Sequence, residues 1–251
     1  NVRPFVDADN FNYLQQWLPK FAGFHSVSQA ISTKGDQIYR SKDKIDQVVY
    51  TGLDLSKFEF RSQVIKNKAM QIISVGRPHW KKGYDNAIKA CYLLKQKELE
   101  FHYTIIGARG NEELLFLINE LALQNQVTLM DKQPQSKIFG LMHTSDLFLL
   151  PSLEEGLANV AVEAMALGCP VISTDCGGME ELITHKKEGW IAPTYSVEKM
   201  ANQILEFSQM DVNEIYMVKE NARLKVEKQH TEEQMVEDMI KLYKHTYDTS
   251  N

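Results

Sequence analysis

Two acidic residues, Glu155 and Glu163, stand eight positions apart around a neutral stretch that begins with Gly156. This spacing fits an ordinary helix, with one carboxylate before it and the other in its first turns, where the helix dipole stabilises the charge. It also fits a pocket that both carboxylates face. In that pocket Glu163 would accept hydrogen bonds from two neighbouring hydroxyl groups, as acidic residues do with ribose. The backbone amides after Gly156 would approach the ligand closely.

Two cations occupy another stretch, which reads VGRPHWKKG. Arg77 follows an apolar run directly, Lys82 comes five residues later, and Gly83 opens a helical pattern. A guanidinium and an ammonium beside a helix N-terminus suit a diphosphate, because charge-assisted donors and the helix dipole both favour an anion. An Arg and a Lys in a loop are more often a solvated surface, so the spacing alone leaves both interpretations open. Glu154 and Glu180 fit solvated or capping residues.

Composition and motifs disfavour several classes of protein. The chain has 251 residues and a formal net charge of -5, whereas a sequence-independent nucleic-acid binder would carry a basic face. No apolar run approaches the roughly 20 residues needed to cross a bilayer. The 7 histidines lack metal-ligand spacing, and no Walker loop, G-x-G-x-x-G fingerprint or G-x-S-x-G elbow occurs. Cys91, Cys169 and Cys176 lack C-x-x-C spacing, so we expect them to pack as small apolar residues in a reducing compartment.

Strand-like and helix-like patterns alternate from about residue 70. We expect strands at residues 70–76, 101–107, 127–130, 146–151 and 170–174. We expect helices at residues 84–95, 112–124, 136–145 and 159–167. The first helix carries an apolar stripe at Tyr84, Ala87, Ile88, Cys91 and Leu94. Alternation of this kind, with near-continuous apolar strands, predicts an α/β fold with a doubly wound parallel sheet covered on both faces.

Glycines mark the ends of the predicted strands. They are Gly76, Gly107, Gly156 and the adjacent Gly177 and Gly178. In parallel sheets of this kind, ligands bind beyond the carboxyl ends of the strands. Four loops are therefore expected to converge on the edge of the sheet where the candidate cations and carboxylates lie.

The two ends of the chain depart from this alternation. Residues 1–60 offer only one helix and two strands, at residues 10–21, 23–28 and 45–52. That is too little for an independent domain, so we interpret this part as the remnant of a preceding domain and a connector. Three helical segments close the chain. The last carries Met235, Met239, Leu242 and Tyr243 on one face, which suits a membrane surface or, more commonly, packing on the body of the protein.

Four segments resemble the C-terminal, donor-binding domain of family 4 glycosyltransferases, which have the GT-B fold. They read VGRPHWKKG, YTIIG, SDLFLLPSLEEGLANVAVEAMALGCPVISTDCGGMEELI and GWIAP, in order and with matching spacing. Glu155 and Glu163 match the E-x7-E motif of that family. The resemblance implies a Rossmann-like nucleotide-sugar donor-binding domain at residues 61–230. It also implies a remnant of the N-terminal acceptor domain with its connector at residues 1–60. From the apolar stripe on the last helix we expect a third part, a C-terminal helix at 231–251 that packs back on the body.

The resemblance also implies a role for each candidate residue. The donor substrate would be a nucleoside diphosphate sugar, with Arg77 and Lys82 on its diphosphate and Glu163 on its ribose hydroxyls. Glu155 would hold hydroxyls of the transferred sugar and, with the two cations, act in catalysis. The remaining donor contacts would come from backbone amides of Gly156, Leu157, Ala158 and Asn159. No metal and no separate cofactor are expected.

The function that the resemblance implies is that of a retaining glycosyltransferase. It would move a sugar to a hydroxyl of a glycan or lipid-linked acceptor, in surface polysaccharide or glycan biosynthesis. We expect a cytoplasmic location, with peripheral contact to the inner face of the membrane through the missing domain. Because most of the acceptor domain is missing, we expect this chain alone to bind donor and transfer little sugar. The alternatives are a nucleotide-sugar binding or regulatory module without transfer activity, and a GT-B sugar-nucleotide epimerase.

Overall fold

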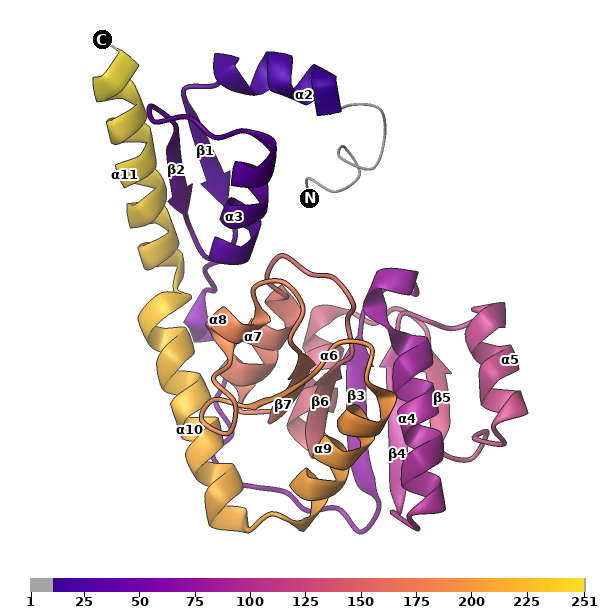
Figure 1. Cartoon of the computed structure of the whole chain (residues 1–251). Helices are drawn as coiled ribbons and strands as arrows, with labels where there is room; N and C mark the ends of the chain where they lie inside the picture. The colour runs from indigo at the N-terminus through magenta and orange to yellow at the C-terminus, as the bar shows by residue number, and fades with distance from the viewer. Residues whose placement is uncertain (1–10, 251) are drawn as a thin grey trace. The chain divides into compact units, whose positions relative to one another are not determined.

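The computed structural model describes residues 11–250, which fold as two units (Figure 1). The larger one, the sheet unit, spans residues 55–227. The smaller one, the terminal unit, joins the described residues up to Asp54 with those from Lys228 onward. Each unit has its own sheet, of six strands in the sheet unit and of two in the terminal unit. The assignment of these parts to donor and acceptor domains stays a prediction.

The sheet unit is built on a parallel sheet with the strand order β5-β4-β3-β6-β7-β8. Its strands are β3 (Met70–Val75), β4 (Phe101–Ile106), β5 (Val127–Met130), β6 (Leu147–Leu150), β7 (Val171–Thr174) and β8 (Trp190–Ala192). The first five lie where the sequence predicts strands. The pattern did not predict β8, whose three residues are too few for a periodic signal.

Helices cover this sheet in two layers. They are α4 (Tyr84–Gln96), α5 (Glu112–Glu120), α6 (Gln135–Thr144), α7 (Asn159–Leu167), α8 (Met179–Leu182), α9 (Val197–Gln209) and α10 (Val212–Gln229), with short 3-10 turns η2 (Leu55–Lys57) and η3 (Trp80–Lys82). α4 packs against α5 and α9, whereas α6 packs against α7. The apolar stripe predicted for α4 is buried along its whole length and enters the main core with strand residues Ile72, Tyr103 and Leu147. The predicted doubly wound α/β fold is confirmed.

The strand order reverses between β3 and β6. From β3 the chain adds β4 and β5 on one side, then returns through α6 and adds β6, β7 and β8 on the other. β3 and β6 are direct neighbours, with Ile72 opposite Leu147. In open α/β sheets the loops that follow the two strands at such a reversal form the ligand crevice. Here the loop after β3 carries Arg77 and Lys82, and the loop after β6 carries Glu155.

A connector, residues 58–63, is held within the sheet unit by two cations of α10. Lys219 Nζ donates to the carbonyl oxygens of Ser62 and Gln63 at 3.2 and 2.7 Å. Arg223 Nη1 donates to the carbonyl oxygens of Phe58 and Ala166 at 3.1 and 2.8 Å. The Lys219 side chain is only 2% exposed. The buried Lys219 and the partly buried Arg223, both bonded to carbonyl oxygens, therefore fix the segment that leads toward β3.

The terminal unit contains more structure than the sequence indicates. Its described elements are α2 (Phe11–Trp17), η1 (Leu18–Lys20), β1 (Gly23–Ser26), α3 (Gln29–Ile38), β2 (Ile45–Val48) and α11 (Glu232–Ser250). The prediction of a single helix within residues 1–60 is wrong, because it misses α3. The apolar residues of this helix are few, and of Ala30, Ile31 and Ile38 only Ile38 is buried, so its sequence signal is weak. It begins instead with a cap, in which the Ser28 hydroxyl accepts from the Ile31 amide at 3.3 Å.

The last helix, α11, packs on β1 and β2 of its own unit. Leu242 is 5% exposed, and the Gly52 amide donates to Met235 Sδ at 3.4 Å. Tyr243, which the pattern placed on the same face, is 64% exposed, and that part of the prediction is wrong. No helix among residues 11–250 is both long enough and apolar enough to span a membrane.

Candidate functional site

Lys82 and Glu155 are in direct contact across the strand-order reversal. Lys82 Nζ lies 2.6 Å from Glu155 Oε1, and the two side chains are 26% and 16% exposed. The Ser152 hydroxyl donates to the same oxygen at 2.9 Å. The other oxygen, Oε2, makes no hydrogen bond with residues 11–250. Glu155 is therefore fixed through one carboxylate oxygen, and its second oxygen can accept from a ligand.

The neighbouring residues repeat this pairing in register. Lys81 Nζ lies 2.7 Å from Glu154 Oε2, with side chains 19% and 11% exposed, and the Lys81 carbonyl accepts from the Leu153 amide at 2.7 Å. Two consecutive lysines of η3 thus pair with two consecutive glutamates after β6. The interpretation of Glu154 as a solvated or capping residue is wrong, because its carboxylate is largely buried against an ammonium group.

Gly83 allows the two loops to approach each other. It ends η3 and begins α4 with φ +61°, a left-handed conformation that favours glycine. A Cβ atom at this position would stand 2.1 Å from the carbonyl oxygen of Pro151. The backbone contact holds Lys82 close to the loop that carries Glu155. A glycine is therefore required at the point where the predicted diphosphate loop turns into its helix.

Arg77 lies at a second close approach, between the loops after β3 and β4. A Cβ atom on Gly107 would come within 2.9 Å of the Gly76 carbonyl oxygen and 3.8 Å of the Arg77 amide nitrogen. The Arg77 side chain is exposed and makes no ion pair or hydrogen bond with the described part of the chain. Its guanidinium is thus available to an anion, but the structure shows no contact of Arg77 with Lys82 or Glu155.

At the start of α7 the groups suited to bind a ligand are backbone amides. Leu157 and Ala158 are buried, and Ala158 at the N-cap position has no group that could cap the helix. The first amides of an uncapped helix lack partners within the helix and suit an anion. Asn159 begins α7 and is exposed. The Gly156 carbonyl accepts from the Gly178 amide at 2.8 Å, which joins this segment to the loop after β7.

Glu163 lies further along α7 and takes no part in these ion pairs. Its carboxylate is half-buried, and Gln135 Nε2 is 3.5 Å from its Oε1, a long contact. Burial raises the pKa of Glu163, and the contact with Gln135 lowers it by less. A partly desolvated carboxylate with such a weak partner is suited to accept hydrogen bonds from a ligand. Among the described residues no hydrogen bond or ion pair joins Glu163 to Glu155.

Sequence reasoning missed the residue that holds Glu155 in place. Ser152 is fully buried, and its carbonyl oxygen accepts a hydrogen bond from the Thr174 hydroxyl on β7. Its own hydroxyl reaches the carboxylate three residues later. A hydroxyl residue at the end of a buried strand, three positions before an acid, is the signal that could have identified it.

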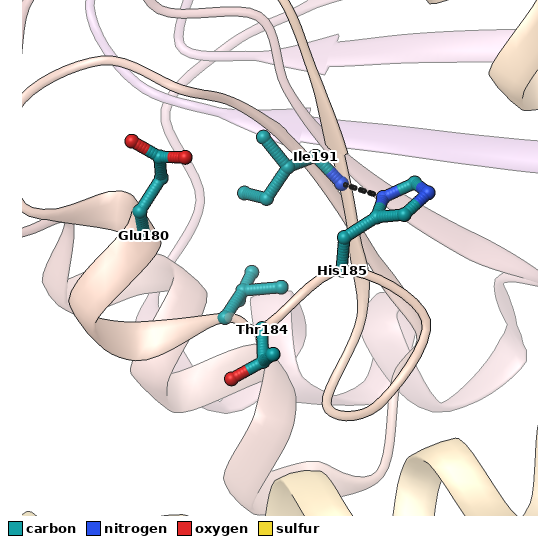
Figure 2. A pocket seen from close by; sticks show the side chains of 5 residues that line it. Glu180, Thr184, His185 and Ile191 are labelled. Carbon is teal, nitrogen blue, oxygen red and sulfur yellow. Dashed lines mark hydrogen bonds between the residues drawn. The ribbon is translucent and has the colours of Figure 1, made fainter.

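A separate hollow of about 290 Å³ lies beside α8 and β8. It is lined by Glu180, Ile183, Thr184, His185 and Ile191 (Figure 2). The Ile191 amide donates to His185 Nδ1 at 3.0 Å. Glu180 is exposed in the first turn of α8, as expected for a solvated or capping residue. None of the predicted site residues lines this hollow.

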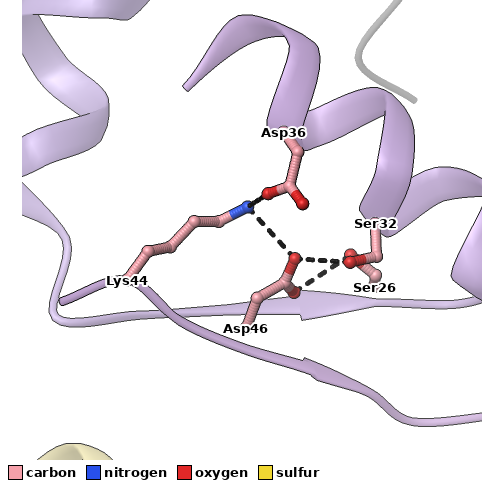
Figure 3. A network of polar contacts seen from close by, with 5 residues as sticks. All are labelled: Ser26, Ser32, Asp36, Lys44 and Asp46. Atoms are coloured by element: carbon pink, nitrogen blue, oxygen red, sulfur yellow. Dashed lines mark hydrogen bonds and ion pairs between the residues drawn. The ribbon is translucent and has the colours of Figure 1, made fainter. Parts of the chain in front are cut away.

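A second polar network belongs to the terminal unit and joins α3 to β1 and β2 (Figure 3). Lys44 Nζ contacts Asp36 at 2.7 Å and Asp46 at 3.1 Å, and the hydroxyls of Ser26 and Ser32 donate to Asp46. Burial lowers the pKa of Lys44, but its hydrogen bonds to both aspartates outweigh this and raise the pKa overall. Every charged group in this network has an oppositely charged partner, so we interpret the network as a contact that holds α3 on the two strands.

The cysteines behave as the sequence predicts. Cys91, Cys169 and Cys176 are free and buried. Burial raises the pKa of Cys169 to about 12 and that of Cys176 to about 11, so both thiols are neutral. Within residues 11–250, no group of three or more His, Cys, Asp or Glu side chains could hold a metal ion. The expectation that the site needs no metal stays a prediction.

The comparison with protein families decides what kind of protein this is. The family described as "Glycosyl transferases group 1" matches residues 56–226. The chain belongs to this family. The match covers nearly the whole sheet unit, from η2 almost to the end of α10, and includes every predicted site residue.

Two curated relatives of this group 1 glycosyl transferase are considerably longer. It is 37% identical over 187 residues to the "Amylovoran biosynthesis glycosyltransferase AmsK" of Erwinia amylovora, a match that covers 72% of the chain and 46% of AmsK. It is 36% identical over 183 residues to WcaL of Escherichia coli K12, provisionally named a colanic acid biosynthesis glycosyltransferase, covering 70% of the chain and 45% of WcaL. The chain thus spans about half the length of the curated relatives it matches.

The fold is shared with solved glycosyltransferases. The Anabaena protein Alr3699/HepE, solved in complex with UDP-glucose, superposes with a TM-score of 0.80 at 22% identity, covering 95% of this chain and 67% of that one. The resemblance to family 4 glycosyltransferases and to the GT-B fold is confirmed. The roles of Arg77, Lys82, Glu155 and Glu163 in donor binding stay predictions.

Proposed function

We propose that this chain is the donor-binding part of a retaining glycosyltransferase that uses a nucleoside diphosphate sugar. The observation that carries the proposal is the position of Lys82 and Glu155. They meet at the strand-order reversal of a sheet that belongs to the group 1 glycosyl transferases. A crevice at that point is where open α/β sheets bind phosphorylated ligands. The relative solved with UDP-glucose supports uridine diphosphate sugars as the first donors to test.

In the proposed reaction, negative charge develops on the diphosphate, close to hydrogen-bond donors of the protein. The bond between the anomeric carbon of the sugar and the diphosphate oxygen breaks, and its electron pair remains on the diphosphate. Arg77, Lys82 and the amides at the start of α7 stabilise that charge as it develops. Glu155 accepts hydrogen bonds from the sugar through its unpaired Oε2, and Glu163 accepts from the ribose. The acceptor hydroxyl then attacks the anomeric carbon on the face that the diphosphate leaves, and its proton passes to the departing phosphate oxygen.

The acceptor is proposed from the relatives. AmsK and WcaL are named for the biosynthesis of amylovoran and colanic acid, so we propose a glycan or lipid-linked glycan of a surface polysaccharide as acceptor. A cytoplasmic location with peripheral contact to the membrane is consistent with that role. Acceptor choice is tested by product analysis of the longest available form of the protein with radiolabelled donor and candidate glycan acceptors.

Removing either cation is expected to weaken binding of the diphosphate but not of the nucleoside. Arg77→Ala and Lys82→Ala should each lower the affinity for a nucleoside diphosphate by about thirtyfold, because a charge-assisted hydrogen bond contributes about 2 kcal/mol. A calorimetric titration with a panel of nucleoside diphosphates and the matching free nucleosides measures both affinities.

Lys89→Ala provides the matched control, because this exposed lysine of α4 forms its ion pair with Asp85 on its own helix, at 3.2 Å. Its affinity for the diphosphate should equal that of the unmodified chain. Equal losses for nucleoside and nucleoside diphosphate in the Arg77 and Lys82 variants would contradict the assignment of these two residues to the phosphates.

A further inference from the structure

The ammonium group proposed to bind the donor already has an anionic partner. Lys82 Nζ contacts Glu155 Oε1 at 2.6 Å, and a diphosphate must share or take over that ammonium group. Both anions then lie close to one cation. Like charges at such short range repel each other strongly when the site is partly shielded from water, as it is here.

Glu155 is not free to move away when a diphosphate arrives. Its Oε1 also accepts from the Ser152 hydroxyl at 2.9 Å, and Ser152 is fully buried. The Thr174 hydroxyl in turn donates to the Ser152 carbonyl, so β7 holds this serine in place. The carboxylate therefore stays beside the phosphates even if Lys82 turns toward them.

We propose that Glu155 opposes the binding of a nucleoside diphosphate alone and favours the same diphosphate when a sugar is attached. The inference rests on the proposed function and adds a specificity role to it. Hydroxyl groups of the sugar can donate to Glu155 Oε2, which has no hydrogen bond with residues 11–250. Those hydrogen bonds offset the repulsion. A diphosphate without a sugar offers no such donor and meets the repulsion in full.

This arrangement has a consequence for the reaction cycle. After transfer, the sugar has left and the diphosphate remains beside an unneutralised carboxylate. Glu155 therefore promotes release of the product while it retains the substrate. The same residue would hold the sugar before the reaction and expel the nucleoside diphosphate after it.

The test is Glu155→Gln, which keeps the size of the side chain and removes its charge. Calorimetric titration of the 251-residue chain is carried out with the tightest nucleoside diphosphate of the panel and with its sugar derivative. We expect affinity for the nucleoside diphosphate to rise about tenfold, because the opposing charge is gone. Affinity for the sugar derivative should rise less or fall, so the preference for the sugar derivative decreases.

Glu154→Gln is the control that the chain supplies. It breaks the parallel ion pair with Lys81, at 2.7 Å, without touching Lys82. It should leave the ratio of the two affinities unchanged. In a Lys82→Ala background, adding Glu155→Gln should still raise the affinity for the diphosphate, because the repulsion by the carboxylate does not depend on Lys82. Ser152→Ala, which only frees the carboxylate to move, should raise the affinity for the diphosphate by a smaller factor.

Failure of this inference and failure of the proposed function would give different results. If Glu155→Gln binds the nucleoside diphosphate no better than the unmodified chain while Lys82→Ala still weakens it, this inference is overturned and the proposed function stands. If no nucleoside diphosphate binds at millimolar concentration, the proposed function and the inference fall together. Circular dichroism of each variant verifies that it remains folded, and Ser152→Ala carries the test if Glu155→Gln does not fold.

Discussion

Replacing Gly177 with alanine is expected to lower the free energy of unfolding by roughly 3 to 5 kcal/mol, since backbone strain and overpacking act together. The residue has φ +59°, a left-handed conformation that a Cβ atom disfavours. That Cβ would also stand 1.8 Å from the carbonyl oxygen of Glu155. The clash is with backbone, so it can be relieved only by moving the loop that carries the ion pair with Lys82. Urea denaturation followed by circular dichroism measures the loss.

Substitutions of two other glycines separate backbone strain from overpacking as causes of this loss of stability. Gly110 has φ +76°, but a Cβ atom there would meet nothing within 4 Å, so Gly110→Ala should show strain alone, about 1 kcal/mol. Gly140 lies inside α6 with open space around it, and Gly140→Ala should stabilise the protein by about 0.5 kcal/mol. If Gly177→Ala costs no more than Gly110→Ala, the close approach of Gly177 to Glu155 is wrong.

Stability is also expected to rise with pH because of Lys219. Burial, with a smaller effect of Arg61, lowers the pKa of Lys219 from 10.5 to about 8 in the folded protein. Below a pH of about 8, Lys219 is charged in both the folded and the unfolded protein, so the cost of burying its charge is present in full. Above that pH the folded protein loses the Lys219 proton first, and the unfolded protein then binds more protons than the folded one. The free energy of unfolding should then increase by about 2 to 3 kcal/mol from about pH 7 to about pH 10.

The variant Lys219→Met isolates this effect. It keeps an unbranched apolar stem in the same space but cannot titrate, so its stability should not show the increase due to Lys219. Urea midpoints of both proteins are measured at several pH values, and the difference between them is the quantity of interest. Parallel curves would mean that Lys219 has an ordinary pKa in the folded protein, against the burial seen between α10 and residues 62–63.

Much of the sheet unit could be predicted from sequence because its signals are local. The apolar stripe of α4 shows a helical period, and β3 to β7 lie in short, near-continuous apolar runs. The sequence patterns did not predict α3 and β8, because both elements give a weak apolar signal. Only one apolar residue of α3, Ile38, is buried, and β8 has only three residues. Tyr243 was misplaced because helical spacing says which residues share a face but not how wide the buried part of that face is.

The candidate site was predictable only up to the edge of the sheet on which it lies. Parallel strands end on one side, so the glycine loops were expected to converge there. The pairing of Lys81 and Lys82 with Glu154 and Glu155 depends on β3 lying next to β6. The spacing of the strands in the sequence does not determine which strands are neighbours in the sheet. The ion pairs therefore could not be predicted from the sequence. The part played by Ser152 depends on the same adjacency.

The double pairing on these two loops bears on how salt affects the protein. Lys81 and Lys82 are each neutralised by a glutamate within 2.7 Å, so four charges sum to nearly zero at the edge of the sheet. Dissolved ions mainly weaken interactions that act over a Debye length of about 10 Å at moderate ionic strength. The two ion pairs therefore contribute little long-range attraction. Arg77 is exposed and has no ion pair with residues 11–250, so salt should mainly weaken the attraction of anions to Arg77.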